Sequence, residues 1–292
     1  MFEHTNKSHF YAFATVSLWA FAYVFTRWIT GDFNPFALSF LRCATAAAVF
    51  VVVLRSRGIG LPARKDWPLF LLSGALGLSV YYILFNLGLQ TITATTSCII
   101  MAMVPLLTAL AASFVFAEKL PAAAWLALGI AFCGILILSL WNNGFSVDVG
   151  VLWSLAAALC LTGYNLIQRY SRKMNYSPLQ VTAYSFFGAT LMLIFFLPEA
   201  AGDFARATWL QRGIVVFLGI FPSAIAYMFW TKAMSIASST SSVANYMFLT
   251  PFLALVLGLV ILNEMPHAGA LLGGAVILGG LGLFSFSTRK PK

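Results

Sequence analysis

The sequence has little charge. Only 9% of its 292 residues are Asp, Glu, Lys or Arg, whereas about a quarter of an average soluble domain is charged. Hydrophobic residues make up 61% of the chain, and the mean hydropathy is +0.91. A chain with so few charged residues cannot form a folded surface that is polar enough to be exposed to water. The composition therefore excludes an ordinary soluble domain and predicts a membrane protein that crosses the lipid bilayer many times.

Side chains that bind metals or perform catalysis are also scarce. The four cysteines lie inside apolar runs without Cys-x-x-Cys spacing, so we interpret them as small core residues and not as disulfides or ligands. They are Cys43, Cys98, Cys133 and Cys160. The three histidines lie in the N-terminal tail or at segment ends. No nucleophile has a base and an orienting partner at usable spacing, so we expect no enzyme, no metal and no cofactor.

Titratable side chains are missing from the middle of the apolar segments. No Asp, Glu, Lys or His occurs there, and the deepest charge is Arg42, about two turns inside its segment. Proton relays and cation pumps depend on such residues. We therefore expect a pathway without a fixed charge, and facilitated or exchange movement without proton coupling.

Ten apolar segments are long enough to cross about 30 Å of hydrocarbon as helices. They run approximately over residues 10–29, 36–54, 67–89, 95–116, 121–140, 149–168, 178–197, 211–233, 240–262 and 267–286. The alternation typical of barrel strands is absent, which favours helices. Lys7 and the following apolar run also fit a cleaved signal peptide. Because the run continues past Ala22 to Phe25, a retained first helix is favoured.

The chain contains an internal repeat. Seven residues of the first half recur 146 positions later in the same order and without a gap. The pairs are Tyr81 and Tyr227, Met101 and Met247, Pro105 and Pro251, Leu107 and Leu253, Glu118 and Glu264, Leu126 and Leu272, and Gly134 and Gly280. The sequence thus predicts an all-α membrane protein of two five-helix halves, residues 1–140 and 141–292.

Basic residues predict the orientation. If both termini share one side, 13 of the 17 Lys and Arg residues fall on that side, which favours cytoplasmic termini. Their scatter between apolar segments argues against binding of nucleic acid, despite the net charge of +9. Because five is an odd number, the second half enters from the opposite face. Such inverted repeats give many secondary transporters two access states around a site near the midplane.

Two matched prolines indicate where the pathway lies. Pro105 and Pro251 cannot donate an amide hydrogen to the carbonyls of Met101 and Met247, four residues earlier. An unpaired carbonyl in the membrane is costly unless it faces a wet cavity or a neighbouring donor. A packing kink is the alternative, but the matched positions favour a pathway.

Aromatic and polar residues at helical spacing mark the other walls of the expected cavity. The candidate substrate-binding residues are Trp19, Tyr23, Tyr82, Asn86, Met101, Tyr164, Asn165, Tyr227, Trp230, Asn245 and Tyr246, with Pro105 and Pro251 as helix breaks. Aromatic faces and carbonyls suit an ammonium group, and the asparagine amides can donate to a carboxylate. A place in the headgroup belt or in an ordinary helix contact is the alternative for each.

Other residues are interpreted structurally. Glycines concentrate in the segments 121–140 and 267–286, which predicts close helix packing within a monomer, with a dimer interface as the alternative. Glu118 and Glu264 lie at segment ends, where we expect them to cap or anchor their own loops.

The repeated pattern of Tyr81, Pro105, Glu118 and Gly134 resembles the EamA-type, ten-helix members of the drug/metabolite transporter superfamily over essentially the whole chain. The resemblance implies cytoplasmic termini, a cavity lined by helices 1, 3, 4, 6, 8 and 9, and export of small metabolites. An aromatic cavity without fixed charge is similar to the amino-acid exporter branch of the YddG type.

We therefore expect a monomeric secondary transporter of the bacterial inner membrane that exports small neutral metabolites, above all amino acids including aromatic ones, by alternating access. Efflux of lipophilic cations is an alternative, but small multidrug pumps use a carboxylate in the first helix, which is absent here. Sugar-phosphate or nucleotide-sugar exchange would need a Lys or Arg in the cavity, and we expect none there. A membrane enzyme acting on lipid is the alternative from another class.

Overall fold

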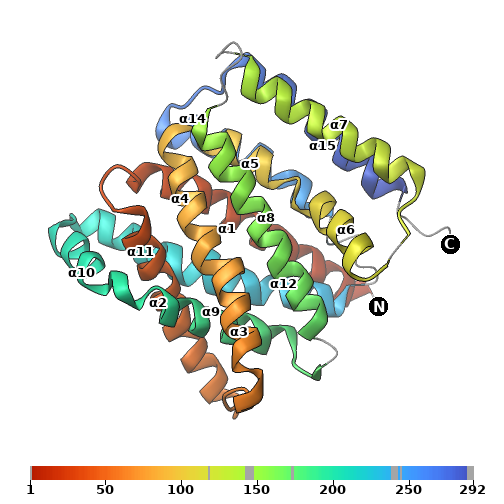
Figure 1. Cartoon of the computed structure of the whole chain (residues 1–292). Coiled ribbons are helices and arrows are strands. Elements are labelled where there is room, and N and C mark those ends of the chain that lie inside the picture. The colour runs from red at the N-terminus through yellow and green to blue at the C-terminus, as the bar shows by residue number, and fades with distance from the viewer. Residues whose placement is uncertain are drawn as a thin grey trace.

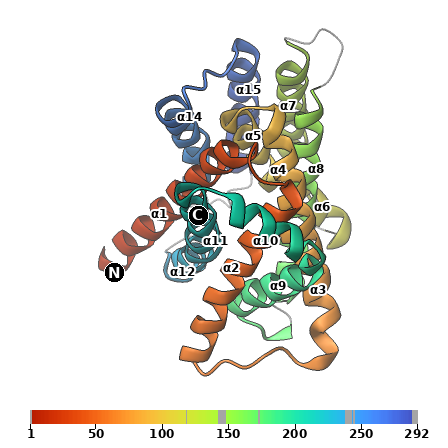
Figure 2. The same ribbon diagram turned by 90° about the vertical axis from the view of Figure 1, so that its left-hand side faces the viewer.

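The structure is a computed structural model that describes residues 2–117, 119–141, 148–171, 174–237, 243 and 245–287. All regular elements in these ranges are helical, which confirms the predicted all-α class. The helices form one bundle, with α7 and α15 side by side along one edge (Figure 1). In Figure 2 these two helices are at the top, and α2, α3 and α9 lie toward the bottom.

The first half of the chain contains seven α-helices joined by short breaks. They are α1 (Phe2–Ile29), α2 (Pro35–Ser56), α3 (Trp67–Gly74), α4 (Tyr81–Thr91), α5 (Ala94–Met101), α6 (Val104–Val115) and α7 (Ala122–Leu140). A 3-10 turn, η1 (Arg64–Asp66), precedes α3, and a π-helical segment, η2 (Ala75–Val80), joins α3 to α4.

The described part of the second half also contains seven α-helices. Its helices are α8 (Val149–Ser171), α9 (Pro178–Met192), α10 (Leu197–Arg206), α11 (Trp209–Ile220), α12 (Ala226–Ile236), α14 (Leu249–Leu262) and α15 (Ala268–Ser287). Short elements connect them: η4 (Ile194–Phe196), the π-helical η5 (Phe221–Ile225) and the 3-10 turn η6 (Asn245–Phe248).

Eight helical stretches of the described residues are long and apolar enough to cross a membrane. The bent pair 178–206 adds a ninth, with a bend of 53° between α9 and the helices after it. The segment expected at 121–140 is α7, which counts only as a shorter apolar helix, Ala122–Leu138. The ten expected segments thus all correspond to helices, although the start of the segment 240–262 lies partly outside the described residues.

Helix irregularities recur at the repeat offset. The π-helical segments begin at Ala75 and Phe221, which are 146 positions apart. The break between α5 and α6, at Ala102 and Met103, corresponds to the change from η6 to α14. Such matched deviations from α-helical geometry indicate that the two halves share their local architecture as well as their sequence pattern.

Polar residues start several helices. Asn34 accepts a hydrogen bond from the Phe36 amide ahead of α2, whose first residue is Pro35. Capping boxes start α9 and α11, each with a hydroxyl residue at the N-cap and a glutamine three positions later. Both features satisfy amides that a helix cannot pair internally, so these helices begin at defined positions.

Glycines bring α7 and α15 together, as their spacing predicts. A Cβ atom at Gly134 would lie 2.7 Å from the Gly273 carbonyl oxygen, and one at Gly280 would lie 2.8 Å from the Ala127 carbonyl oxygen. Only the absence of a side chain permits this approach of the two backbones, which is visible along the edge of the bundle in Figure 1.

The cysteines divide into two groups. Cys43 and Cys98 are buried, as expected for core residues, but Cys133 is exposed and Cys160 is half-buried. The expectation is therefore wrong for Cys133, which projects from the outer face of α7. An apolar run does not reveal which of its faces is turned away from the bundle.

Candidate functional site

A cavity of about 1000 Å³ lies inside the bundle. Its walls come from α1, α4, α5, α6, α8, α12 and α14, as the resemblance implied, together with Arg42 of α2 and with Pro178 and Thr182 of α9. The second and seventh spans thus also contribute to the walls, which the sequence interpretation did not expect. The packing of neighbouring helices leaves Arg42 of the second span and Thr182 of the seventh facing the cavity.

Most of the expected site residues meet in this cavity. The lining includes Trp19, Tyr23, Tyr82, Met101, Tyr164, Asn165, Tyr227 and Trp230, together with Pro105 and Pro251. Residues from both halves of the chain therefore surround one space. Among the lining residues that sequence reasoning missed are Thr108, Thr182 and Thr231.

An aromatic cluster joins α1 to α12 at the cavity wall. The Trp19 ring lies 5.8 Å from the ring of Tyr227 and 5.3 Å from that of Trp230, measured between centroids. The rings of Tyr23 and Phe85, which also line the cavity, meet edge to face with 5.2 Å between their centroids. Such surfaces can contact an apolar side chain or an ammonium group.

Both prolines adjoin a real break in the helix. α5 ends at Met101, the amides of Ala102 and Met103 form tight-turn hydrogen bonds, and α6 then carries Pro105 in its first turn. Pro251 lies in the first turn of α14, directly after η6. Met101, Met247 and both prolines line the cavity, so the interruptions lie beside the open space.

Three expected residues do not reach the cavity. The Asn86 amide nitrogen donates to the Pro35 carbonyl and to the Ser39 hydroxyl, 3.0 Å each, so it connects α4 to α2. Asn245 accepts a bond from the Ser285 hydroxyl at 3.5 Å. Tyr246 packs beside the His9 ring. Helical spacing placed these residues on polar faces, but neighbouring helices occupy those faces.

Arg42 corrects the expectation of a pathway without fixed charge. It lines the cavity although its side chain is only 2% exposed. Transfer of an arginine to a membrane helix centre costs at least about 2.5–3.5 kcal/mol. The described lining residues contain Arg42 and the exposed Arg169 but no Asp or Glu. The sequence did show an arginine inside an apolar run, a signal that should have led to a functional hypothesis.

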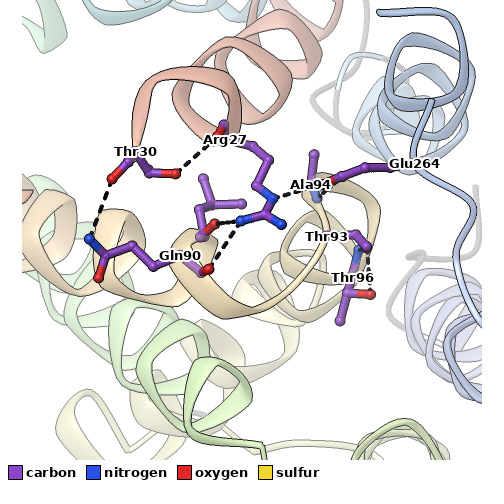
Figure 3. Close-up of polar contacts among 8 residues, drawn as sticks. Arg27, Thr30, Gln90, Thr93, Ala94, Thr96 and Glu264 are labelled. Atoms are coloured by element: carbon purple, nitrogen blue, oxygen red, sulfur yellow. Dashed lines mark hydrogen bonds and ion pairs between the residues drawn. The ribbon is translucent and has the colours of Figure 1, made fainter. Parts of the chain in front are cut away.

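Figure 3 shows a polar cluster around Arg27 and Glu264. On α1, Arg27 lies about one helical turn after Tyr23, which lines the cavity. The Arg27 Nε atom pairs with the Glu264 carboxylate at 2.7 Å, and Arg27 Nη1 donates to the carbonyls of Leu89 and Gln90. Glu264 also accepts the Ala94 amide at 3.2 Å. The cluster joins the ends of α1, α4 and α14 to the start of α5.

This arrangement corrects the expected role of Glu264, which holds two distant helices and not its own loop. The cause is the fold, which brings the end of α14 beside the end of α1. Its repeat partner Glu118 lies outside the described residues.

The cavity reaches the opposite end of the bundle. Its lining includes Arg169 near the end of α8, Pro178 at the start of α9 and Ser235 near the end of α12. The space therefore extends from the aromatic cluster to that end, whereas the cluster around Arg27 and Glu264 ties helices together at the other end.

Comparisons with known proteins agree with this architecture. A protein of Streptantibioticus cattleyicolor named a probable terminal-alkyne amino-acid exporter is 29% identical over 94% of this chain and 92% of its own length. Transporter YdfC of Bacillus subtilis is 28% identical over 91% and 87%. The biotin transporter of Escherichia coli is 28% identical over 90% and 88%.

A solved crystal structure shares the fold, with a TM-score of 0.66 and 23% sequence identity over 98% of both chains. Residues 6–140 and 148–286 each match the EamA-like transporter family. These relatives are named as transporters and not as enzymes. The multi-span helical bundle, its central cavity and both matched segments together show that the chain is a membrane protein belonging to the EamA-like transporter family.

Proposed function

We propose that the protein exports small neutral metabolites, above all amino acids including aromatic ones, by alternating access through the central cavity. The observation that carries the proposal is the cavity of about 1000 Å³, which has aromatic walls and extends toward one end of the bundle. At the other end the Arg27–Glu264 pair joins the helices. An open end and a tied end are what one state of an alternating-access cycle requires.

Alternating access also gives the two halves a role. Residues 1–140 and 141–292 act as inverted repeats that exchange conformations, with both termini on the cytoplasmic side of the bacterial inner membrane. The matched π-helical segments at Ala75–Val80 and Phe221–Ile225 support this symmetry. Because both halves of one chain line the cavity, a monomer suffices for transport.

The substrate assignment rests on the chemistry of the walls. Trp19, Tyr227 and Trp230 offer aromatic faces, and Met101 and Met247 offer flexible thioethers that adapt to different side chains. Substrate-binding roles fall to Trp19, Tyr23, Tyr82, Met101, Tyr164, Asn165, Tyr227 and Trp230. Related transporters named for an amino acid and for biotin have cargoes that carry a carboxylate, which also supports this class.

Efflux of lipophilic cations is less compatible with the walls. The described lining holds two arginines and no carboxylate, so its electrostatic potential opposes a lone cation.

The test is counterflow of radiolabelled amino acids into liposomes that contain the purified protein. We expect uptake of phenylalanine, methionine or threonine, and Trp230→Ala should reduce it at least about fivefold, because one buried aromatic contact contributes about 1 kcal/mol or more. Trp209→Ala is the matched control, since Trp209 is 82% exposed and does not line the cavity. Carriage of a lipophilic cation or a sugar phosphate without any amino acid would show that the substrate class is wrong.

A further inference from the structure

Arg42 is held by residues from two other elements, α1 and α4. Its Nη1 atom donates to the Thr26 hydroxyl of α1 at 3.1 Å. Its guanidinium carbon lies 4.1 Å from the centre of the Tyr82 ring on α4. The Tyr82 hydroxyl is itself bonded to Ser223 of η5 at 2.9 Å. Tyr82 is therefore anchored, and the contacts with Thr26 and Tyr82 restrict the movement of the charged group.

These contacts leave the guanidinium incompletely paired. Arg42 Nε is buried and has no hydrogen-bond partner among the described residues. No carboxylate in the described part of the chain forms an ion pair with Arg42. Thr26 and the Tyr82 ring cannot neutralise a full positive charge. A buried, unpaired charge is strongly unfavourable unless an opposite charge arrives.

An opposite charge can reach Arg42 through the cavity, because Arg42 is part of its wall. We propose that Arg42 binds the carboxylate of the transported substrate, a proposal that rests on the transport function proposed above. A guanidinium presents donors in a planar fork that matches a carboxylate, so Nε and a terminal nitrogen can each donate to one oxygen. The protein would therefore select substrates with a carboxylate and an apolar or aromatic body.

Under this assignment, different parts of the cavity bind the carboxylate and the apolar body of the substrate. The carboxylate lies at Arg42, on the α2 and α4 side, and the apolar body lies against Trp19 and Trp230, whose rings are 5.3 Å apart. Arg42 thus takes the carboxylate-binding role that the sequence assigned to Asn86 and Asn245, which lie outside the cavity. Zwitterionic amino acids and organic monocarboxylates meet the requirement, whereas amines without a carboxylate do not.

A purely structural role is the alternative. Arg42 connects α1, α2 and α4, and it would do so even if no substrate touched it. The two roles differ in what they predict for selectivity. A structural arginine changes stability and overall rate, whereas a carboxylate-binding arginine also determines which competitors bind.

The first experiment uses the unmodified protein in liposomes. Counterflow of labelled phenylalanine is competed with phenylalanine, 3-phenylpropionate, phenethylamine and glycerol 3-phosphate. These compare a zwitterion, its carboxylate alone, its ammonium alone and a phosphate ester. We expect 3-phenylpropionate to compete within about tenfold of phenylalanine, and phenethylamine to be at least tenfold weaker than 3-phenylpropionate. Stronger competition by phenethylamine or by the phosphate ester overturns the proposal.

The second experiment uses Arg42→Gln and Arg42→Lys, with Arg55→Gln as control because Arg55 lies exposed on the same helix. Arg42→Gln should raise the KM for phenylalanine at least tenfold and remove the preference for 3-phenylpropionate over phenethylamine. Arg42→Lys keeps the positive charge but loses the planar fork of donors. Its KM and its preference for 3-phenylpropionate should therefore lie between those of the unmodified protein and those of Arg42→Gln. An unchanged preference in a folded Arg42→Gln protein overturns the proposal.

Two readouts separate the possible failures. If the unmodified protein carries no amino acid, the proposed function fails at the level of transport. If it carries phenylalanine but phenethylamine competes equally well, only the role of Arg42 fails. Should Arg42→Gln not fold, the competition series with the unmodified protein still decides the question. Quenching of tryptophan fluorescence measures binding independently of transport, since Trp19 and Trp230 line the cavity.

Discussion

Arg27 and Glu264 are 237 positions apart in the chain, and their side chains form an ion pair with an Nε–Oε1 distance of 2.7 Å. Both side chains are mostly shielded, with exposed fractions of 29% and 17%. The pair joins α1 of the first half to the end of α14 in the second half (Figure 3). Any movement that separates these helix ends must break it.

Glu264→Gln should increase the population of the state in which this end of the cavity is open. A charge-assisted hydrogen bond contributes about 1.5–3 kcal/mol, so its loss should shift the ratio of the two access states by a factor of about 10–100. Buried Cys98 lines the cavity and can report this change once the other cysteines are replaced. Faster labelling of Cys98 by an external, membrane-impermeant maleimide is the expected result.

The Cys98 labelling experiment has two control variants. Glu199→Gln removes an exposed acid on α10 and should leave Cys98 labelling unchanged. Glu264→Asp, which keeps the carboxylate, should give slower labelling of Cys98 than Glu264→Gln. If Glu264→Gln labels no faster than the parent, the pair does not restrain this end.

Pro105→Ala and Pro251→Ala should each slow transport while expression stays near normal. Alanine supplies the amide donor that proline lacks, so the helix can become continuous across the carbonyl of Met101 or Met247. Counterflow rates measure the effect, with Pro198→Ala as control because Pro198 also lies in the first turn of a helix, α10, but is exposed and does not line the cavity. Full activity in both cavity variants would assign the prolines to packing alone.

Membrane orientation can be measured at two glycines with open surroundings. Gly60 lies in the loop between α2 and η1, and Gly31 lies between α1 and α2; a Cβ at either meets nothing within 4 Å. In a cysteine-free background, Gly60→Cys should react with an impermeant maleimide only from the cytoplasm and Gly31→Cys only from outside. The reverse pattern would invert the assignment of both ends of the cavity.

Gly134→Ala should destabilise the protein, because the new methyl group would lie 2.7 Å from the Gly273 carbonyl oxygen and from Ile277. Overpacking of this kind costs about 1–3 kcal/mol and should lower the midpoint of thermal unfolding in detergent. Gly129→Ala on the same helix has no atom within 4 Å and should be neutral or stabilising, because alanine is the better helix former. Equal effects of the two substitutions would contradict the close contact of α7 and α15.

Transport should follow the substrate gradient and depend only weakly on a proton gradient. The described cavity lining contains no Asp, Glu or His that could take up a proton during the cycle. Phenylalanine uptake into liposomes is measured with and without an imposed pH step. Uphill accumulation driven by the pH step alone would require a proton site elsewhere, first of all at Glu264.

The sequence alone determined the general architecture. Low charge and ten apolar segments predicted the helical membrane bundle, and the offset of 146 residues predicted two related halves, because apolar length and internal periodicity are properties of the chain itself. The prolines likewise predicted where helices break, since a missing amide donor acts locally.

Tertiary structure decided which polar side chains share a space. Asn86 and Tyr82 lie one turn apart on α4, yet Asn86 binds backbone and hydroxyl groups of α2 whereas Tyr82 lines the cavity. Arg42 and the Arg27–Glu264 pair could not be placed from local pattern, because their partners come from distant segments. A sequence shows which residues a helix carries, but the packing of neighbouring helices determines which face remains open to a substrate.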